Sequence, residues 1–182
     1  MQMASRNYYA ETAGSTPALQ ALQSRVEAEV CVVGGGFAGL NTALGLAERG
    51  VRDVVLVEAD TPAFGASGRN GGFVFGGFSR GEASLLRDLG PSRASELYTG
   101  TTQAVELIRR RIARHGIACD DTQAGILWVN WFRDPDVLRQ RQALLSKSFG
   151  QDWRWMGRDE VRRQLRTTRY HDALYEPQAF HF

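Results

Sequence analysis

The chain has 182 residues, of which 43% are hydrophobic and 23% are charged, and this balance is typical of a folded globular protein rather than a disordered or fibrous one. Its 22 basic and 20 acidic residues leave a net charge of +2, which is too small to indicate nucleic acid as a partner. No stretch reaches the roughly 18 apolar residues of a membrane-spanning helix, and the N-terminus lacks the apolar core of a signal peptide. These properties predict a cytoplasmic protein without a membrane span.

The first predicted unit is a strand, a helix and a second strand. Residues 30–33 (VCVV) and 54–57 (VVLV) are short apolar runs typical of parallel strands that are buried on both faces. A helix is expected between Gly39 and Glu48, because apolar residues recur there at helical spacing. These residues are Leu40, Ala43, Leu44 and Ala47. The three elements within about 30 residues predict a right-handed βαβ crossover.

The remaining elements follow a glycine-rich, irregular stretch at residues 61–82. They are a long helix from Pro91 to His115, a strand at 125–132, a helix from Asp134-Pro135 to Gly150 and a short helix at 159–165. The long helix has a predicted buried stripe of Leu97, Ala104, Ile108 and Ile112. Its last turns carry Arg109, Arg110, Arg111 and Arg114, which are expected on a solvated face near the helix C-terminus.

The two cysteines, Cys31 and Cys119, have no partner at metal-ligand spacing, so no metal site is predicted. Cys31 lies inside the first predicted strand and is expected to be a small buried apolar residue. The histidines His115, His171 and His181 are expected to be structural or solvated. A group of aromatic residues could line a substrate pocket, but packing in the core or between domains is favoured for them. This group is Trp128, Trp131, Tyr170 and Tyr175.

A phosphate-binding turn is predicted directly after the first strand. Residues 34–39 (GGGFAG) match the pattern G-x-G-x-x-G, which is informative here because it joins a strand to a helix inside a βαβ unit. Gly34 permits the tight turn, Gly36 lets the backbone approach a pyrophosphate, and Gly39 allows close packing of the helix on the strand. The N–H groups at the start of the helix then face the phosphates.

Glu58 directly follows the second strand, at the position where a carboxylate accepts hydrogen bonds from the ribose of a dinucleotide. A carboxylate at this position repels a 2′-phosphate, so NAD or FAD is favoured over NADP. The turn and Glu58 together do not separate NAD from FAD. An NAD-dependent dehydrogenase therefore remains an alternative interpretation at this point.

A second glycine-rich segment, GASGRNGG at residues 65–72, favours FAD. Long loops inside compact domains are usually functional or disordered, and the apolar residues that follow at 73–78 argue against disorder. Arg69 is suited to a diphosphate, and Gly71-Gly72 permit close approach of the backbone to a flat ring. FAD is extended enough to need a second such segment.

The segments NYYAETA, VEAEVCVVGGGFAGLNTALGLAERG, VVLVEAD, FGASGRNGGF and YHDALYEPQ resemble the N-terminal part of the FAD-dependent D-amino-acid oxidase superfamily. Within it, the likeness is to the bacterial glycine/D-amino-acid oxidase and γ-glutamylputrescine oxidase type. The resemblance covers essentially the whole chain. The block from Ser67 to Gly72 is more specific to this family than the first glycine turn.

The resemblance implies an α/β fold with an FAD-binding, Rossmann-like βαβ domain of the glutathione-reductase type in residues 1–116. The beginning of an α+β antiparallel substrate domain is expected in residues 117–182, so the chain is expected to be truncated. The expected cofactor is FAD, bound non-covalently because the loop has neither histidine nor cysteine. The residues assigned to it are Gly34, Gly35, Gly36, Phe37, Ala38, Gly39, Glu58, Ala59, Ser67, Gly68, Arg69, Asn70, Gly71 and Gly72.

The activity that the resemblance implies is oxidation of a C–N bond in a small amine or amino acid by hydride transfer to the flavin. No residue of this chain is assigned as a catalytic base. Family members continue for roughly as long again, so this chain by itself is expected to be inactive. An alternative is a noncatalytic fragment that does not retain FAD. The substrate, the electron acceptor and the oligomeric state are not specified by the sequence.

Overall fold

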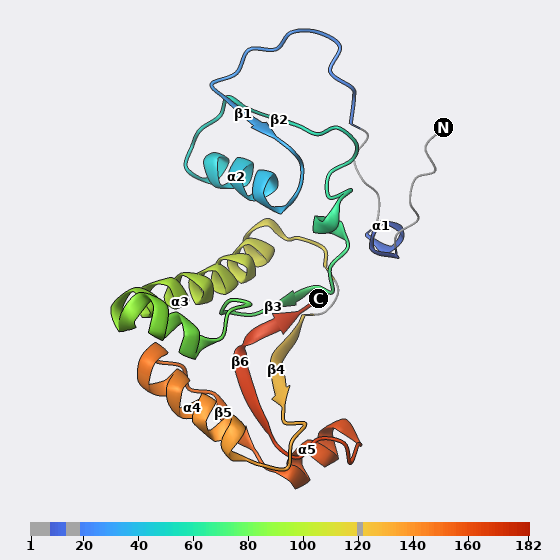
Figure 1. Cartoon of the computed structure of the whole chain (residues 1–182). Helices are drawn as coiled ribbons and strands as arrows, with labels where there is room; N and C mark the ends of the chain where they lie inside the picture. The colour runs from blue at the N-terminus through green and yellow to red at the C-terminus, as the bar shows by residue number, and fades with distance from the viewer. Residues whose placement is uncertain (1–7, 14–18, 120–121) are drawn as a thin grey trace. The chain divides into compact units, whose positions relative to one another are not determined.

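The computed structural model describes residues 8–13, 19–119 and 122–182, and the chain divides into two compact units, residues 1–71 and 72–182 (Figure 1). Each unit has a sheet of its own. The predicted division between residues 116 and 117 separates an FAD-binding part from a substrate-binding part, and it stays a prediction. Among the described residues, no helix is both long and apolar enough to cross a bilayer.

The first unit contains the predicted βαβ motif. Its elements are α1 (Tyr8–Thr12), β1 (Val30–Val33), α2 (Phe37–Glu48), β2 (Val54–Val57) and the 3-10 turn η1 (Ala66–Gly68). β1 and β2 are parallel, and the register runs from Val30 beside Val54 to Val33 beside Val57. The helix ends where predicted, because Gly50 follows its last turn with a φ of 87° that favours glycine. The strands and the helix of this unit are therefore confirmed.

Burial of β1 on both faces was a wrong prediction for the described residues. The side chain of Val33 is 82% exposed, and Cys31 is exposed rather than buried. The physical reason is that β1 pairs only with β2 in the part of the chain that the structure describes. A strand packed in this way keeps one face and one edge accessible, whatever its apolar content.

The second unit is an antiparallel sheet with helices. Its elements are β3 (Phe73–Val74), α3 (Glu82–His115), β4 (Gln123–Val129), α4 (Asp136–Phe149), β5 (Arg154–Met156), α5 (Arg158–Leu165) and β6 (Ala173–His181). β6 is the central strand: β4 pairs along one edge, while β5 and β3 pair with the beginning and the end of β6. β4 ends at Val129, three residues before the predicted end, so Trp131 and Phe132 lie outside the strand and are exposed.

The two faces of this sheet have different cores. Leu174 of β6 and Trp128 of β4 pack with buried residues of α3 and α4, which lie together beside the sheet in Figure 1. Ala173 and Tyr175, the neighbours of Leu174 in β6, pack instead with Val161 of α5 and Met156. Successive side chains of a strand point to opposite faces, so one strand supplies both cores.

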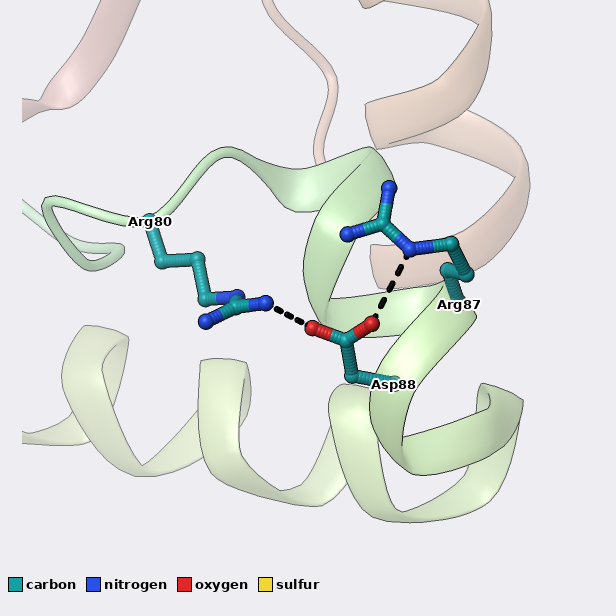
Figure 2. A network of polar contacts seen from close by, with 3 residues as sticks. All are labelled: Arg80, Arg87 and Asp88. Atoms are coloured by element: carbon teal, nitrogen blue, oxygen red, sulfur yellow. Dashed lines mark hydrogen bonds and ion pairs between the residues drawn. The ribbon is translucent and has the colours of Figure 1, made fainter.

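α3 is two helical segments joined at Gly90. Gly90 has φ 74° and ψ 165°, which interrupts the helix, and Pro91 then occupies the first turn of the second segment. The predicted start at Pro91 is correct for the second segment, but the segment from Glu82 was not predicted. Figure 2 shows Arg80 and Arg87 both contacting the carboxylate of Asp88, which links the preceding loop to this first segment.

The buried stripe of α3 differs from the predicted one. In the segment that starts at Pro91, the buried apolar side chains are Ala94, Tyr98 and Val105, whereas Leu97 is 42% exposed and Ala104 is exposed. The prediction considered aliphatic residues alone, but the ring of Tyr98 packs on Phe149 of α4 with centroids 4.6 Å apart, and this contact fixes the rotation of the helix. Arg111 lies on the buried side with an exposed fraction of 9%, so its predicted place on a solvated face was wrong.

Candidate cofactor-binding site

The candidate site begins where the two parallel strands of the first unit end. Gly34 leaves β1 with a φ of 100°, a conformation that favours glycine. Its N–H donates to the carbonyl of Val57 at 2.8 Å, which extends the pairing of the two strands by one residue. Gly34 and Glu58 consequently emerge beside each other at the carboxyl edge of the sheet, where ligands of open parallel sheets bind.

The Glu58 carboxylate closes the glycine turn. Its Oε2 accepts a hydrogen bond from the Gly35 N–H at 2.5 Å, and its Oε1 accepts one from the Asp60 N–H at 3.1 Å. The hydrogen bond from Gly35, followed by that from Asp60, lowers the pKa of Glu58 below its ordinary value of 4.5. The side chain is therefore a carboxylate at neutral pH, the form that accepts hydrogen bonds from ribose hydroxyls.

The second glycine-rich segment contacts the first glycine turn directly. The hydroxyl oxygen of Ser67 accepts a hydrogen bond from the backbone N–H of Phe37, the first residue of α2, at 3.0 Å. A Cβ atom on Gly36 would lie 2.9 Å from the same oxygen, which is closer than such atoms pack. A side chain at position 36 would therefore require the Ser67 hydroxyl to move away from the turn.

Two further close approaches explain other small residues. A Cβ atom on Gly39 would overlap the carbonyl oxygen of Gly34, so only glycine lets α2 lie this close to the turn. Gly35 is held from the other side, because its carbonyl accepts the N–H of Ala63 at 2.9 Å. Ala63 has a φ of 63°, which is uncommon for alanine. Only the turn-forming Thr61-Pro62 before it pointed to an unusual backbone at Ala63.

The start of α2 retains donors for an anion. Within the described ranges, the N–H groups of Gly36, Ala38 and Gly39 have no acceptor, whereas those of Gly35 and Phe37 are bonded to Glu58 and Ser67. Unpaired N–H groups at a helix N-terminus, with the helix dipole behind them, favour phosphate. The residues present therefore fit the pyrophosphate and ribose of FAD.

The other residues predicted to bind the cofactor belong to the loop after Ser67 or follow Glu58. The side-chain amide of Asn70 donates to the carbonyl of Ser67 at 2.8 Å and so closes the loop on itself. Arg69 is exposed, with its guanidinium 5.5 Å from the centroid of the Phe64 ring, and Ala59 is also exposed. Gly68 packs so closely on Ala63 that a Cβ would overlap its carbonyl oxygen.

The first unit thus brings together Gly34–Gly39, Glu58 and Ser67. Gly72 belongs to the second unit, where its carbonyl accepts the N–H of Phe182 at 3.4 Å. The described residues contain no cluster of three or more His, Cys, Asp and Glu side chains able to hold a metal ion.

Comparison with known proteins identifies the family. A family model described as FAD dependent oxidoreductase (DAO) matches residues 29–182. The chain is 33% identical over 175 residues to gamma-glutamylputrescine oxidoreductase of Escherichia coli K12, covering 96% of this chain and 41% of that protein. It is 30% identical over 178 residues to the probable oxidoreductase OrdL of Haemophilus influenzae, covering 97% of this chain and 41% of that protein. The chain therefore spans about two fifths of the length of these relatives.

Solved structures agree with this result. L-amino acid deaminase from Proteus vulgaris superposes with a TM-score of 0.62 and 27% identity over 90% of this chain and 37% of that chain. Glycine oxidase from Bacillus cereus shares the fold, with a TM-score of 0.53 and 23% identity over 85% of this chain and 40% of that chain. FAD is the cofactor of the family, which confirms FAD over the NAD alternative. The chain belongs to the DAO family of FAD-dependent oxidoreductases.

Proposed function

We propose that this chain forms the dinucleotide-binding part of an enzyme that oxidises the C–N bond of a small amine or amino acid with non-covalently bound FAD. The contact between Ser67 and Phe37 carries this proposal, because it joins the family's second glycine-rich segment to the phosphate-binding turn. A plain dinucleotide-binding turn needs no such segment.

Each part of the proposed site has a separate task. The N–H groups of Gly36, Ala38 and Gly39 bind the pyrophosphate, and the Glu58 carboxylate accepts hydrogen bonds from the adenosine ribose. Gly71 leaves the backbone free to approach the flavin side of the cofactor. The flavin, when bound, supplies the hydride acceptor, so this chain contributes binding and orientation.

The names of the relatives support the substrate class. One relative is named for γ-glutamylputrescine, an amine, and the Proteus vulgaris protein is named for L-amino acids. We extend the shared chemistry, a carbon bonded to an amine nitrogen, to this protein. Its cytoplasmic location stays a prediction from the sequence.

The proposal is tested with the adenosine half of the cofactor. ADP contains the ribose and pyrophosphate that Glu58 and the glycine turn are proposed to bind, and these residues all lie in the first unit. Isothermal titration of the chain should show binding of ADP and FAD, and weaker or no binding of FMN, which lacks the adenosine. Gly36→Val should abolish ADP binding, while Gly65→Ala should leave it unchanged because a Cβ on Gly65 would meet no atom within 4 Å.

Undiminished ADP binding by Gly36→Val in a folded protein would contradict the placement of the pyrophosphate. The reaction is tested separately by anaerobic bleaching of bound flavin with γ-glutamylputrescine and with D- and L-amino acids. Bleaching by none of the amines, in a protein extended to the length of its relatives and loaded with FAD, would contradict the proposed substrate class.

A further inference from the structure

The backbone immediately after the Ser67–Gly72 loop is held by α3. The N–H of Gly77 donates to the hydroxyl oxygen of Thr101 at 2.7 Å, and that hydroxyl donates in turn to the carbonyl of Tyr98 at 2.6 Å. Gly77 has a φ of 91°, and the ring of Tyr98 would lie 3.6 Å from a Cβ at this position. Thr101 therefore fixes one specific turn of the backbone rather than filling space.

A buried carboxylate lies beside the preceding residue. Glu176 of β6 is 3% exposed and accepts a hydrogen bond from Nε1 of Trp128 at 2.7 Å. The N–H of Gly76 is close enough to this carboxylate to lower its pKa. Gly76 is itself buried, and a Cβ there would lie 3.1 Å from the Thr102 side chain. The ring of Phe75 meets that of Trp128 edge-on, with centroids 5.6 Å apart.

The strand before these glycines is held by the sheet. Phe73 and Val74 of β3 pair with His181 and Phe180 of β6, and Gly72 accepts the Phe182 N–H. The chain passes directly from Gly71 into this segment. The end of the cofactor loop is thus connected to a backbone that is paired or hydrogen-bonded at Gly72, Phe73, Val74 and Gly77. Between them, Phe75 is held through its ring and Gly76 is buried.

Burying a carboxylate in a protein core costs free energy. Burial raises the pKa of Glu176, because desolvation outweighs the hydrogen bonds from Trp128 and Gly76 and the attraction of Arg141. Arg141 of α4 is paired with Glu82 of α3 at 2.7 Å, and the Tyr98 hydroxyl, whose pKa is raised to about 12, completes the surrounding charged and titratable groups. A group with this cost is retained more readily where its hydrogen bonds have a use beyond stability.

We propose that Thr101 and Glu176 are positioning residues for the cofactor loop: by holding the backbone of Gly76 and Gly77, they fix the path of the chain as it leaves Ser67–Gly72. This inference rests on the function proposed above for that loop. It predicts that loosening Gly77 changes the dynamics of residues 67–72 and weakens binding of the flavin half of the cofactor. Binding of the adenosine half should be unaffected, because the turn and Glu58 lie in the other unit.

Thr101→Val tests the inference, because valine keeps the shape of threonine and removes the hydroxyl. Thr102→Val is the matched control: within the described part of the chain, the Thr102 hydroxyl donates to the carbonyl of Thr99 alone, three residues earlier in the same helix. The two variants lose the same kind of helical contact, and only Thr101→Val also loses the acceptor of the Gly77 N–H. Thr101→Ser keeps the hydroxyl and should restore the original behaviour.

Hydrogen exchange of the chain without cofactor is the first measurement. In Thr101→Val, exchange should become faster at residues 76–77 and also at residues 67–72, while Thr102→Val and Thr101→Ser should match the original chain. Faster exchange confined to residues 76–77 would make Thr101 a local structural residue and overturn the inference. Unchanged exchange at residues 76–77 would overturn it as well.

Ligand binding separates this inference from the proposed function. Thr101→Val should weaken FAD binding by about threefold to tenfold, the effect of one lost hydrogen bond, and leave ADP binding unchanged. Equal FAD affinity in Thr101→Val and Thr102→Val would contradict the positioning role alone. A chain in which Gly36→Val leaves ADP binding intact would contradict the proposed function, whatever the exchange result for Thr101.

Discussion

Ser67 and Phe37 are 30 residues apart in the chain and are joined by a hydrogen bond of 3.0 Å, from the backbone N–H of Phe37 to the Ser67 hydroxyl. This bond makes the two glycine-rich segments parts of one structure. It also supplies the first turn of α2 with a side-chain acceptor that its own N-cap residue, Gly36, lacks. The position of the loop is thereby tied to the end of the helix that is proposed to face the phosphates.

The contact between Gly36 and Ser67 predicts a coupled effect of two mutations. Gly36→Ala places a Cβ 2.9 Å from the Ser67 oxygen, so it should destabilise the chain by about 1–3 kcal/mol, as overpacking does. Ser67→Ala removes that oxygen and leaves Cβ atoms at an ordinary distance. In the Ser67→Ala background, Gly36→Ala should therefore cost measurably less.

Urea unfolding of the four chains measures this coupling as a double-mutant cycle. Additive free energies, within the usual error of about 0.5 kcal/mol, would show that the two residues do not meet.

Gly39→Ala should be more damaging than Gly36→Ala. Its Cβ would overlap a backbone atom, the Gly34 carbonyl oxygen, which cannot rotate away as a side chain can. We expect α2 to separate from β1 and the chain to lose at least about 2 kcal/mol of stability, together with ADP binding. Thermal unfolding followed by circular dichroism measures the loss, with Gly65→Ala as the control. Equal melting temperatures for the two variants would refute the close packing of α2 on the turn.

The lowered pKa of Glu58 predicts a contribution to folding stability that is lost in acid. Its folded-state pKa is lowered, so its ionised form contributes stability that is fully present above the unfolded value of 4.5 and is lost as the pH falls through the folded value. Glu58→Gln keeps an acceptor for the Gly35 N–H but does not titrate. The difference in unfolding free energy between the original chain and this variant should be constant near neutral pH and shrink below about pH 4.5. A difference that does not change with pH would contradict the assignment.

The raised pKa of Glu176 predicts that folding stability depends on pH in the opposite direction. Its folded-state pKa is raised, so the fold favours the protonated acid, and this stability is present below 4.5 and is lost as the pH rises through the folded value. At pH 7 the original chain carries the cost of a buried carboxylate, which Glu176→Gln removes while keeping an acceptor for Trp128. Glu176→Gln should therefore be the more stable chain at pH 7, and its advantage should decrease toward pH 4.

Unfolding free energies of both chains across this range test the sign. Glu160→Gln is the control for simple loss of a negative charge, because Glu160 lies on the surface and pairs with Arg154 there. A destabilised Glu176→Gln at pH 7 would show that the contacts of the carboxylate with Trp128 and Gly76 outweigh the cost of burial.

Local sequence patterns predicted the first unit well. The apolar runs at residues 30–33 and 54–57 became strands with those bounds, because short β-branched segments flanked by glycine and charge have few other structures available. The proximity of the glycine turn and Glu58 was predictable for the same reason, because a βαβ unit brings the ends of its two parallel strands together. Their binding of a cofactor stays a prediction. What the pattern did not contain was the contact of Ser67 with Phe37, which depends on how the loop folds back.

The second unit was harder because its contacts are distant in sequence. Nothing near Thr101 indicates that its hydroxyl bonds to Gly77, 24 residues earlier. Likewise, Glu176 stands in an apolar stretch whose burial depends on Trp128 from another strand. Tyr98 and Arg111 lie on the buried face of α3 because tertiary partners decide which face of a helix is buried. Helical spacing alone does not determine how the helix is rotated about its axis.

The hydrogen bond from Gly35 to Glu58 has a consequence for protein engineering. In this chain the carboxylate that is proposed to select the cofactor's ribose also maintains the shape of the phosphate turn. Exchanging Glu58 for a small or basic residue, the obvious step toward a phosphorylated ribose, would remove the acceptor of the Gly35 N–H at the same time. A change of cofactor preference would therefore require a compensating acceptor for Gly35, and libraries that vary residue 58 alone should yield chains with a damaged turn rather than a new specificity.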